Sequence, residues 1–111
     1  MESLNEKRRR IRAPYRVRAR LEIAGTTEAG VAWTVQTRDA NEWGMRIESP
    51  RLPPRVAVLV HLRAPEGAQL TVKGWIIHAH LISVDLWEAG VEFDQPQPLL
   101  SVSRIDLSRA D

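Results

Sequence analysis

Apolar residues alternate with polar ones in several short segments of this chain, and this period of two constrains the fold most strongly. In segment 16–23 the apolar residues occupy one face, and the other face carries Arg16, Arg18, Arg20 and Glu22. Similar strand-like segments follow near residues 31–38, 45–47, 56–62, 70–81 and 86–93. Short strands at a spacing of about 10 residues predict an all-β sandwich or barrel, and closure would remove exposed strand edges.

The alternation changes parity within segment 70–81. One apolar set is Leu70, Val72, Gly74 and Ile76, and the other is Ile77, Ala79 and Leu81. A single strand directs both sets at one core only if an extra residue is inserted, so we expect a β-bulge near residues 76–77. This register places Trp75, His78 and His80 on the outer face of the strand.

The remaining segments divide the chain into three parts. Residues 1–13 are mostly polar and aperiodic, which predicts a flexible basic arm, and Pro14 favours an extended entry into the folded part. Residues 14–98 form the predicted barrel, a single domain for a chain of 111 residues. Residues 99–111 form a tail whose apolar spacing is compatible with a short helix.

Positive charge is concentrated at one end of the chain. Of the 16 Lys and Arg residues, eight lie between Lys7 and Arg20, while 12 of the 14 acidic residues lie beyond Arg20. The net charge of +2 therefore conceals a basic N-terminal region and an acidic remainder. A cluster of guanidinium groups indicates an anionic partner, and phosphate suits the bidentate geometry of arginine.

Composition argues against several classes of protein. The chain has no cysteine, so disulfides and thiolate metal sites are excluded. No apolar stretch approaches the roughly 18 residues that span a membrane, and no apolar segment follows the basic N-terminus as in a secretory signal. We expect a cytoplasmic protein that does not insert into membranes.

Catalytic and metal-binding patterns are scarce. The sequence has no His-x-x-x-His spacing and no Walker-type glycine run, so we expect neither an enzyme nor a bound cofactor. His78 and His80 could present two metal ligands on one strand face. Without a third ligand, such histidines are more often plain surface residues.

Two polar clusters are the remaining candidates for a functional site. The first is Lys7-Arg8-Arg9-Arg10-Ile11-Arg12, which contains the spacing Arg-x-x-x-Arg, and the second is Asp39-Ala40-Asn41-Glu42-Trp43-Gly44, which interrupts a strand. Each alone has a simple explanation, because any basic arm supplies the first pattern and Asp, Asn and Gly form turns. Their order along a chain of short strands is more specific.

In this order the two clusters resemble the signatures of the PilZ domain family, an RxxxR segment before the first strand and a [D/N]xSxxG segment between strands. The stretches GMRIES, VKGWIIHAH and AGVEF extend the resemblance over about residues 6–94. The resemblance implies a six-stranded antiparallel PilZ-type β-barrel from a bacterium. It also implies a ligand, the second messenger cyclic di-GMP.

The resemblance assigns ligand-binding roles to individual residues. Arg8 and Arg12 match the motif arginines and Arg9 lies at the neighbouring position, so these three are expected to contact phosphates and guanine edges. Asp39 matches the motif acid, which accepts hydrogen bonds from the guanine N1–H and N2–H. Gly44 matches the motif glycine, where a Cβ would interfere with the backbone.

Three further positions complete the expected site. Asn41 replaces the motif serine and keeps a short polar side chain. Its bulk and geometry differ from those of serine, which is expected to affect the affinity for the ligand. The family sometimes places an aromatic residue in the bulged strand, where it stacks on guanine. In this chain that position is His78, and Trp75 lies nearby on the same outer face.

Three functions are compatible with these features. The first is a cyclic di-GMP receptor whose residues 7–13 become ordered on binding and signal to a protein partner. The second is a PilZ-like adaptor that has lost ligand binding, which the replacement at Asn41 favours. The third is a nucleic-acid-binding barrel, which we expect least because the predicted outer faces carry few aromatic residues and the barrel is acidic.

Overall fold

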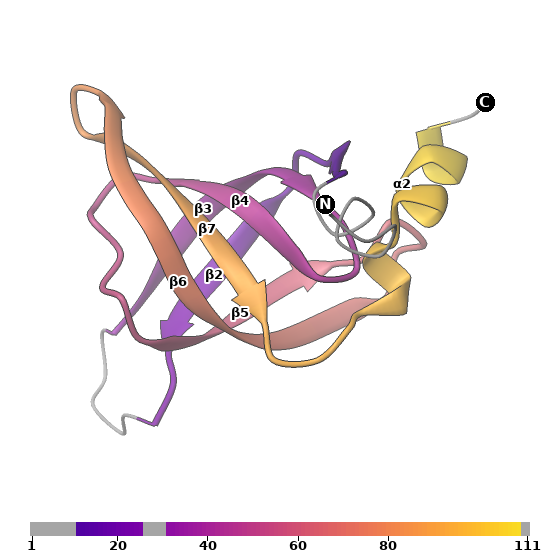
Figure 1. Cartoon of the computed structure of the whole chain (residues 1–111), viewed down its shortest axis with the longest axis horizontal. Helices are drawn as coiled ribbons and strands as arrows, with labels where there is room; N and C mark the ends of the chain where they lie inside the picture. The colour runs from indigo at the N-terminus through magenta and orange to yellow at the C-terminus, as the bar shows by residue number, and fades with distance from the viewer. Residues whose placement is uncertain (1–10, 26–30, 110–111) are drawn as a thin grey trace, which may run out of the picture.

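The structure, a computed structural model, describes residues 11–25 and 31–109. It forms a closed antiparallel barrel of six strands with one extra short strand and a C-terminal helix (Figure 1). Its elements are β1 (Ala13–Pro14), β2 (Arg18–Ile23), β3 (Ala32–Ala40), β4 (Gly44–Ser49), β5 (Ala57–Arg63), β6 (Gln69–Ser83), β7 (Leu86–Phe93), a 3₁₀ turn (Pro98–Leu100) and α2 (Val102–Arg109). The predicted all-β barrel and C-terminal helix are confirmed.

The order of the strands explains how the sheet closes. The strands follow one another as β1-β3-β2-β5-β6-β7-β4, and the additional pairing of β3 with β4 closes the six strands β2 to β7 into a ring, with β1 added beside β3. Consecutive strands such as β2 and β3, or β5 and β6, form antiparallel hairpins. Closure gives the six main strands neighbours on both sides, which removes long open edges.

The core consists of the inward-facing residues of the alternating segments. Leu21 of β2, Ile47 of β4 and Val60 of β5 are all fully buried. The segment after β7 covers one end of the barrel, because Leu100 and Ile105 are also fully buried in this core. The short helix α2 is therefore held by apolar contacts with the barrel rather than by its own stability.

The bulge in β6 is confirmed, slightly later than predicted. The pairing of β6 with β7 shifts between Ile77 and His80, and His78 at this point has a positive φ of 51°. As predicted, Trp75, His78 and His80 are exposed.

The inward orientation predicted for Leu81 is wrong, since this side chain is 54% exposed. The pairing of β5 with β6 extends only to Ala57 opposite Trp75, so the later part of β6 runs beyond the core. The hairpin of β6 and β7 projects from the barrel there (Figure 1). Leu81 consequently has no opposite wall to pack against.

Two segment boundaries also differ from the sequence-based expectation. Asp39 and Ala40, predicted to interrupt the second strand, are the last residues of β3. Ala13, predicted as the end of the arm, is buried in β1 and pairs with Ala40. The sheet therefore begins at Ala13, one residue before the boundary predicted from the polar composition of the arm. Residues 1–10 of the arm lie outside the described part of the chain.

The packing of α2 can be tested with a matched pair of substitutions. Replacing the fully buried Ile105 with Ala leaves a cavity and should lower the free energy of unfolding by about 2–5 kcal/mol. Leu107→Ala, in the same helix but 75% exposed, should change it by less than about 0.5 kcal/mol. Urea unfolding measures both; equal effects would contradict the docking of α2 on the barrel.

Candidate functional site

Asp39 reaches the outer face of the barrel because β3 contains a bulge. The pairing of β3 with β4 skips Arg38, so that Asp39 lies directly opposite Arg46. Thr37 and Ala40, on either side of this pair of residues, are fully buried and point to the core. A regular strand would give Asp39 the inward parity of Thr37, and the extra residue turns the carboxylate outward instead.

The arm reaches the same place through β1, which pairs with the end of β3. Arg12 directly precedes β1, and its Nε lies 2.8 Å from Oδ1 of Asp39. On the other side, Arg46 Nε donates a hydrogen bond of 2.7 Å to Oδ2 of Asp39, and a second nitrogen of the same guanidinium contacts this oxygen. The structure therefore brings the predicted site residues Arg12 and Asp39 together.

The two oxygens of Asp39 differ in how they are satisfied. The hydrogen bond to Oδ2 raises the pKa of Arg46, which keeps this guanidinium charged. The contact of Arg12 with Oδ1 is an ion pair without hydrogen-bond alignment, and this buried oxygen accepts no hydrogen bond from the described residues. Oδ1 is therefore paired with the charge of Arg12 but can still accept an aligned hydrogen bond from another donor.

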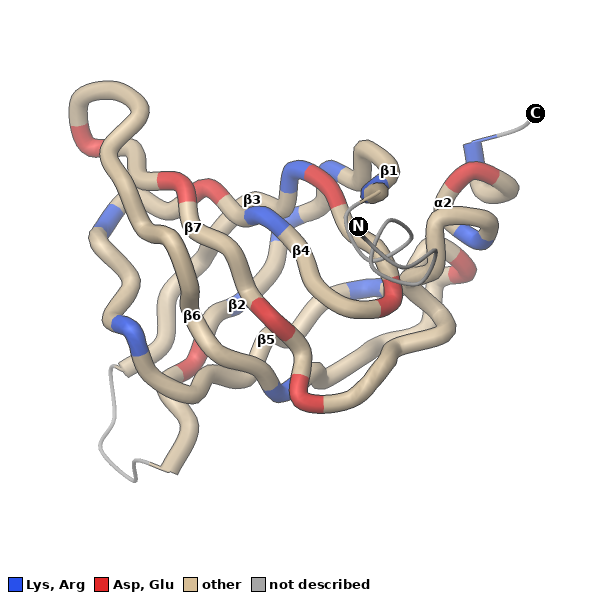
Figure 2. Tube along the Cα trace, viewed as in Figure 1, with Lys and Arg blue, Asp and Glu red and all other residues tan. Residues whose placement is uncertain are grey.

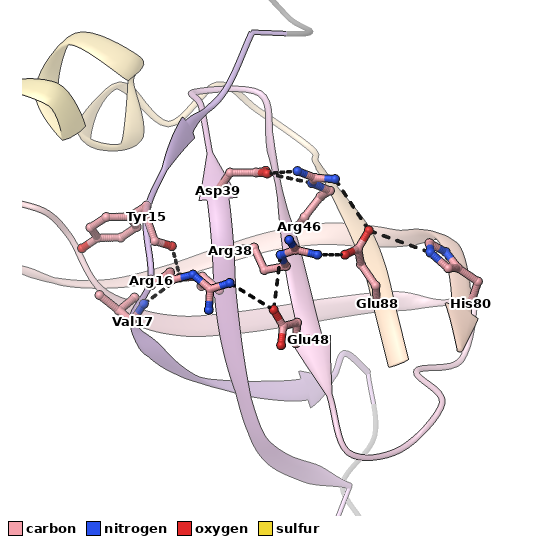
Figure 3. A network of polar contacts seen from close by, with 10 residues as sticks. Tyr15, Arg16, Val17, Arg38, Asp39, Arg46, Glu48, His80 and Glu88 are labelled. Carbon is pink, nitrogen blue, oxygen red and sulfur yellow. Dashed lines mark hydrogen bonds and ion pairs between the residues drawn. The ribbon is translucent and has the colours of Figure 1, made fainter. Parts of the chain in front are cut away.

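Asp39 and Arg46 lie at one end of a chain of alternating charges (Figure 3). Glu48 of β4 and Glu88 of β7 are directly opposite each other, and the repulsion between their like charges would destabilise this pair of strands. Arg38, the bulge residue, contacts both carboxylates and so relieves this repulsion. The other contacts in this network of charged residues join Arg16 to Glu48 at 3.5 Å, Arg46 to Glu88 at 3.6 Å and His80 to Glu88 at 3.9 Å.

This network of ion pairs was not predicted from the sequence, although the sequence contains a signal for it. Arg46 and Glu48 occupy the outward parity of β4, and Glu88 occupies the outward parity of β7. Basic and acidic residues lie side by side where β3, β4 and β7 meet (Figure 2). Recognising the pairs requires the strand order, which the sequence alone does not provide.

Asn41 organises the turn between β3 and β4. Its side chain is 2% exposed, and its Oδ1 accepts hydrogen bonds from the backbone N–H of Trp43 at 2.7 Å and of Gly44 at 3.0 Å. Its Nδ2 donates to the backbone oxygen of Ile11 at 2.9 Å, which ties the arm to this turn. Serine, with one hydroxyl, could not supply the acceptor and the donor on separate atoms. Direct contact of Asn41 with a ligand remains a prediction.

Beside Asp39 the outer face is hollowed. A cavity of about 180 Å³ is lined by Arg12, Trp43, Gly44, Ile77, Val91 and Glu92. An added Cβ on Gly44 would lie 2.6 Å from the backbone oxygen of Val91, so this position requires glycine. Trp43, which was not among the predicted site residues, also borders two neighbouring cavities of about 230 and 270 Å³.

The other predicted site residues lie further away or outside the description. Trp75 is opposite Glu92, which is itself opposite Gly44, so Trp75 shares their outer face about 10 Å away across β7. His78 is exposed at the bulge, and within residues 11–25 and 31–109 no hydrogen bond or ion pair joins it to Arg12 or Asp39. Arg8 and Arg9 lie outside the described residues.

Comparison of the chain with family models, with curated proteins and with solved structures gives no match. The resemblance to the PilZ family therefore rests on the sequence motifs.

The described ranges contain neither a metal-ligand cluster nor a membrane-spanning helix. No group of three or more His, Cys, Asp or Glu side chains there could hold a metal ion. In the same ranges, no helix is long and apolar enough to cross a membrane.

The structural role of Asn41 gives a direct test. Asn41→Ala leaves two turn N–H groups and the Ile11 carbonyl without these partners and should lower the free energy of unfolding by about 1–3 kcal/mol. Asn41→Ser should lose less, because its hydroxyl can replace one of the bonds. Gln95→Ala, at an exposed loop position, is the control in the same urea titration. An Asn41→Ala protein as stable as this control would refute the role.

Proposed function

We propose that this protein is a PilZ-type receptor for cyclic di-GMP in the bacterial cytoplasm, with no catalytic activity. The observation that supports it best is the meeting of the two motifs. Arg12 of the first and Asp39 of the second lie in contact on the outer face of the barrel, beside a cavity that contains Gly44 of the second motif. The resemblance to the PilZ family assigns Arg12, Asp39 and Gly44 to one ligand-binding site.

The chemistry of Asp39 suits guanine. The Watson–Crick edge of guanine presents two neighbouring N–H donors, N1–H and N2–H, and a carboxylate can accept from both. Asp39 offers Oδ1, which accepts no hydrogen bond from the described residues, while Arg46 retains Oδ2. Guanine would therefore give Oδ1 the aligned hydrogen bond that Arg12, at 2.8 Å, does not make.

The phosphates of the ligand would then engage Arg12. Its side chain is 33% exposed and covers Oδ1, so a guanine that reaches Asp39 must displace it. A displaced guanidinium at the mouth of the cavity is placed to pair with a phosphodiester, whose geometry it matches in a bidentate manner. Binding thus exchanges one ion pair of Arg12 for another. Arg8 and Arg9 of the same arm are proposed to add further charge.

The cavity next to Asp39 suits the flat face of a purine. Gly44 and Gly90 leave the outer surfaces of β4 and β7 without side chains, and Ile77 and Trp43 provide apolar surface beside them. In this proposal guanine lies against this surface with its edge towards Asp39. Trp75, half exposed on the same face, is proposed to stack on a second base.

The arm also contacts the part of the protein that would pass on the signal. Asn41 holds Ile11, and Arg109 of α2 donates a hydrogen bond of 3.3 Å to the backbone oxygen of Pro14 in β1. Displacement of Arg12 would therefore disturb a segment that lies between the ligand and α2. We propose that a protein partner recognises this altered surface.

A second candidate function, an adaptor that binds no nucleotide, is favoured by a separate observation. Asp39 is already neutralised by Arg12 and Arg46, and Glu92 adds negative charge to the cavity at whose mouth the phosphates would lie. In an adaptor, this ion pair would fix the arm permanently against the barrel. The titration below separates the two functions.

Calorimetric titration with cyclic di-GMP tests the proposal. We expect saturable binding, which Arg8→Ala, Arg12→Ala and Asp39→Asn each weaken by on the order of 1–3 kcal/mol, because each change leaves a charged hydrogen-bonding group unpaired. Arg16→Ala removes an arginine of the same region that contacts Glu48 instead, so it should bind like the wild type.

GTP and single-stranded DNA serve as control ligands in the same titration. Absence of heat at high micromolar cyclic di-GMP would refute the receptor and support the adaptor. Equal binding of DNA with a steep dependence on salt would instead indicate a nucleic-acid-binding barrel.

A further inference from the structure

A second group of arginines lies on the outer face of β2 and β5. Arg18 and Arg20 are two residues apart in β2, and Arg63 lies two residues after His61 in β5, so the side chains within each strand share a face. Arg20 is directly opposite His61, which brings the two strands into one face. The cyclic di-GMP proposal uses none of these residues.

The pairing of the strands arranges this face in two rows. In one row Arg20 and His61 lie between Thr34 of β3 and Thr71 of β6. In the other row Arg18 is opposite Gln36, and Arg63 is opposite Gln69. We call these eight residues the arginine face: Arg18, Arg20, Thr34, Gln36, His61, Arg63, Gln69 and Thr71.

The arginines of this face differ from those of the charge network. In the described ranges no carboxylate lies within 4 Å of the side chains of Arg18, Arg20 or Arg63, and all three residues are exposed. Among the described residues, the Arg63 side chain donates only to the backbone oxygen of Gly67, at 3.2 Å. The carboxylate that borders the face, that of Glu22, lies 3.6 Å from His61.

The arginine face therefore holds positive charge that the described residues do not neutralise. Neighbouring guanidinium groups repel one another, and an anion between them would relieve the repulsion. A cavity of about 270 Å³ opens here, lined by Arg18, Arg20, Arg63, Thr34, His61 and Gln69 together with Ala19 and Leu62. Its polar side chains can all donate hydrogen bonds, which suits a ligand rich in acceptors.

The composition of the face distinguishes between two kinds of polyanion. Proteins that bind single-stranded nucleic acid combine positive charge with aromatic side chains on which the bases stack. The two rows contain no Phe, Tyr or Trp. Carboxylates need no stacking surface, and arginine pairs with them in a bidentate manner.

We propose that the arginine face is a docking surface for an acidic protein segment, rich in Asp and Glu. Its carboxylates pair with Arg18, Arg20 and Arg63, and the Thr and Gln side chains around them donate further hydrogen bonds. The charge complementarity of the face selects this partner. The proposal is independent of nucleotide binding, since the face shares no residue with the site at Asp39.

A labelled peptide of ten glutamates tests the proposal on the full chain, by fluorescence anisotropy and by chemical-shift mapping of the backbone amides. We expect the peptide to shift the resonances of residues 18–20, 34–36 and 61–63. The double variant Arg18→Gln, Arg20→Gln should weaken binding by roughly five- to tenfold, the loss of two exposed ion pairs. Added salt should weaken wild-type binding as well.

Two control variants remove the same charge elsewhere. The pair Arg51→Gln, Arg55→Gln changes two exposed arginines between β4 and β5, and the pair Arg8→Gln, Arg9→Gln changes the arm. Both should bind the peptide within about twofold of the wild type. Circular dichroism establishes that each variant is folded.

Three outcomes would overturn the proposal. One is an absence of peptide binding to the wild type, and another is a loss of binding in the arm variant but not in the variant of Arg18 and Arg20. The third is tighter binding of a ten-residue thymidine oligonucleotide that depends on the same two arginines, which would make the face a nucleic-acid surface.

Discussion

The arrangement of the candidate site depends on one carboxylate, that of Asp39, held between Arg12 and Arg46. The first arginine belongs to the arm and the second to β4, so this interaction connects the N-terminal segment to the barrel wall. It exists because the bulge at Arg38 turns Asp39 outward while Thr37 and Ala40 remain in the core. A bulge of one residue thus moves a position of core parity to the outer face of the barrel, where the two arginines cover it.

The same bulge determines the charge balance around the site. Arg38 is the extra residue, and it lies between Glu48 and Glu88, which face each other across β4 and β7. Arg46 in turn joins Glu88 to Asp39. This part of the barrel is therefore nearly neutral, and a ligand must compete with ion pairs that already exist. The arginine face on β2 and β5 is the opposite case, since its guanidinium groups have no carboxylate among the described residues.

Much of the fold could be predicted from the sequence because it follows from local alternation. The change of parity in segment 70–81 revealed the bulge of β6 to within two residues. The bulge of β3 was missed, although the buried positions Val35, Thr37 and Ala40 contain the same signal. Thr and Ala are weak markers of a core face, and Asp39 followed by Asn41 has the composition of a turn.

The candidate site could be predicted only in part. The motifs grouped Arg12, Asp39 and Gly44, and the structure places these residues together. Trp43 was not recognised, because its position beside three cavities depends on the turn that Asn41 organises. The ion pairs of Arg46 also escaped prediction, since contacts between strands distant in sequence require the order of the strands.

A crystal structure of the chain with saturating cyclic di-GMP tests the central claim most directly. The account predicts a guanine whose N1–H and N2–H donate to Asp39, with its ring against Gly44 and with the Arg12 guanidinium moved from Oδ1 to a phosphate. A ligand bound elsewhere, with the contact between Arg12 and Asp39 unchanged at 2.8 Å, would contradict it.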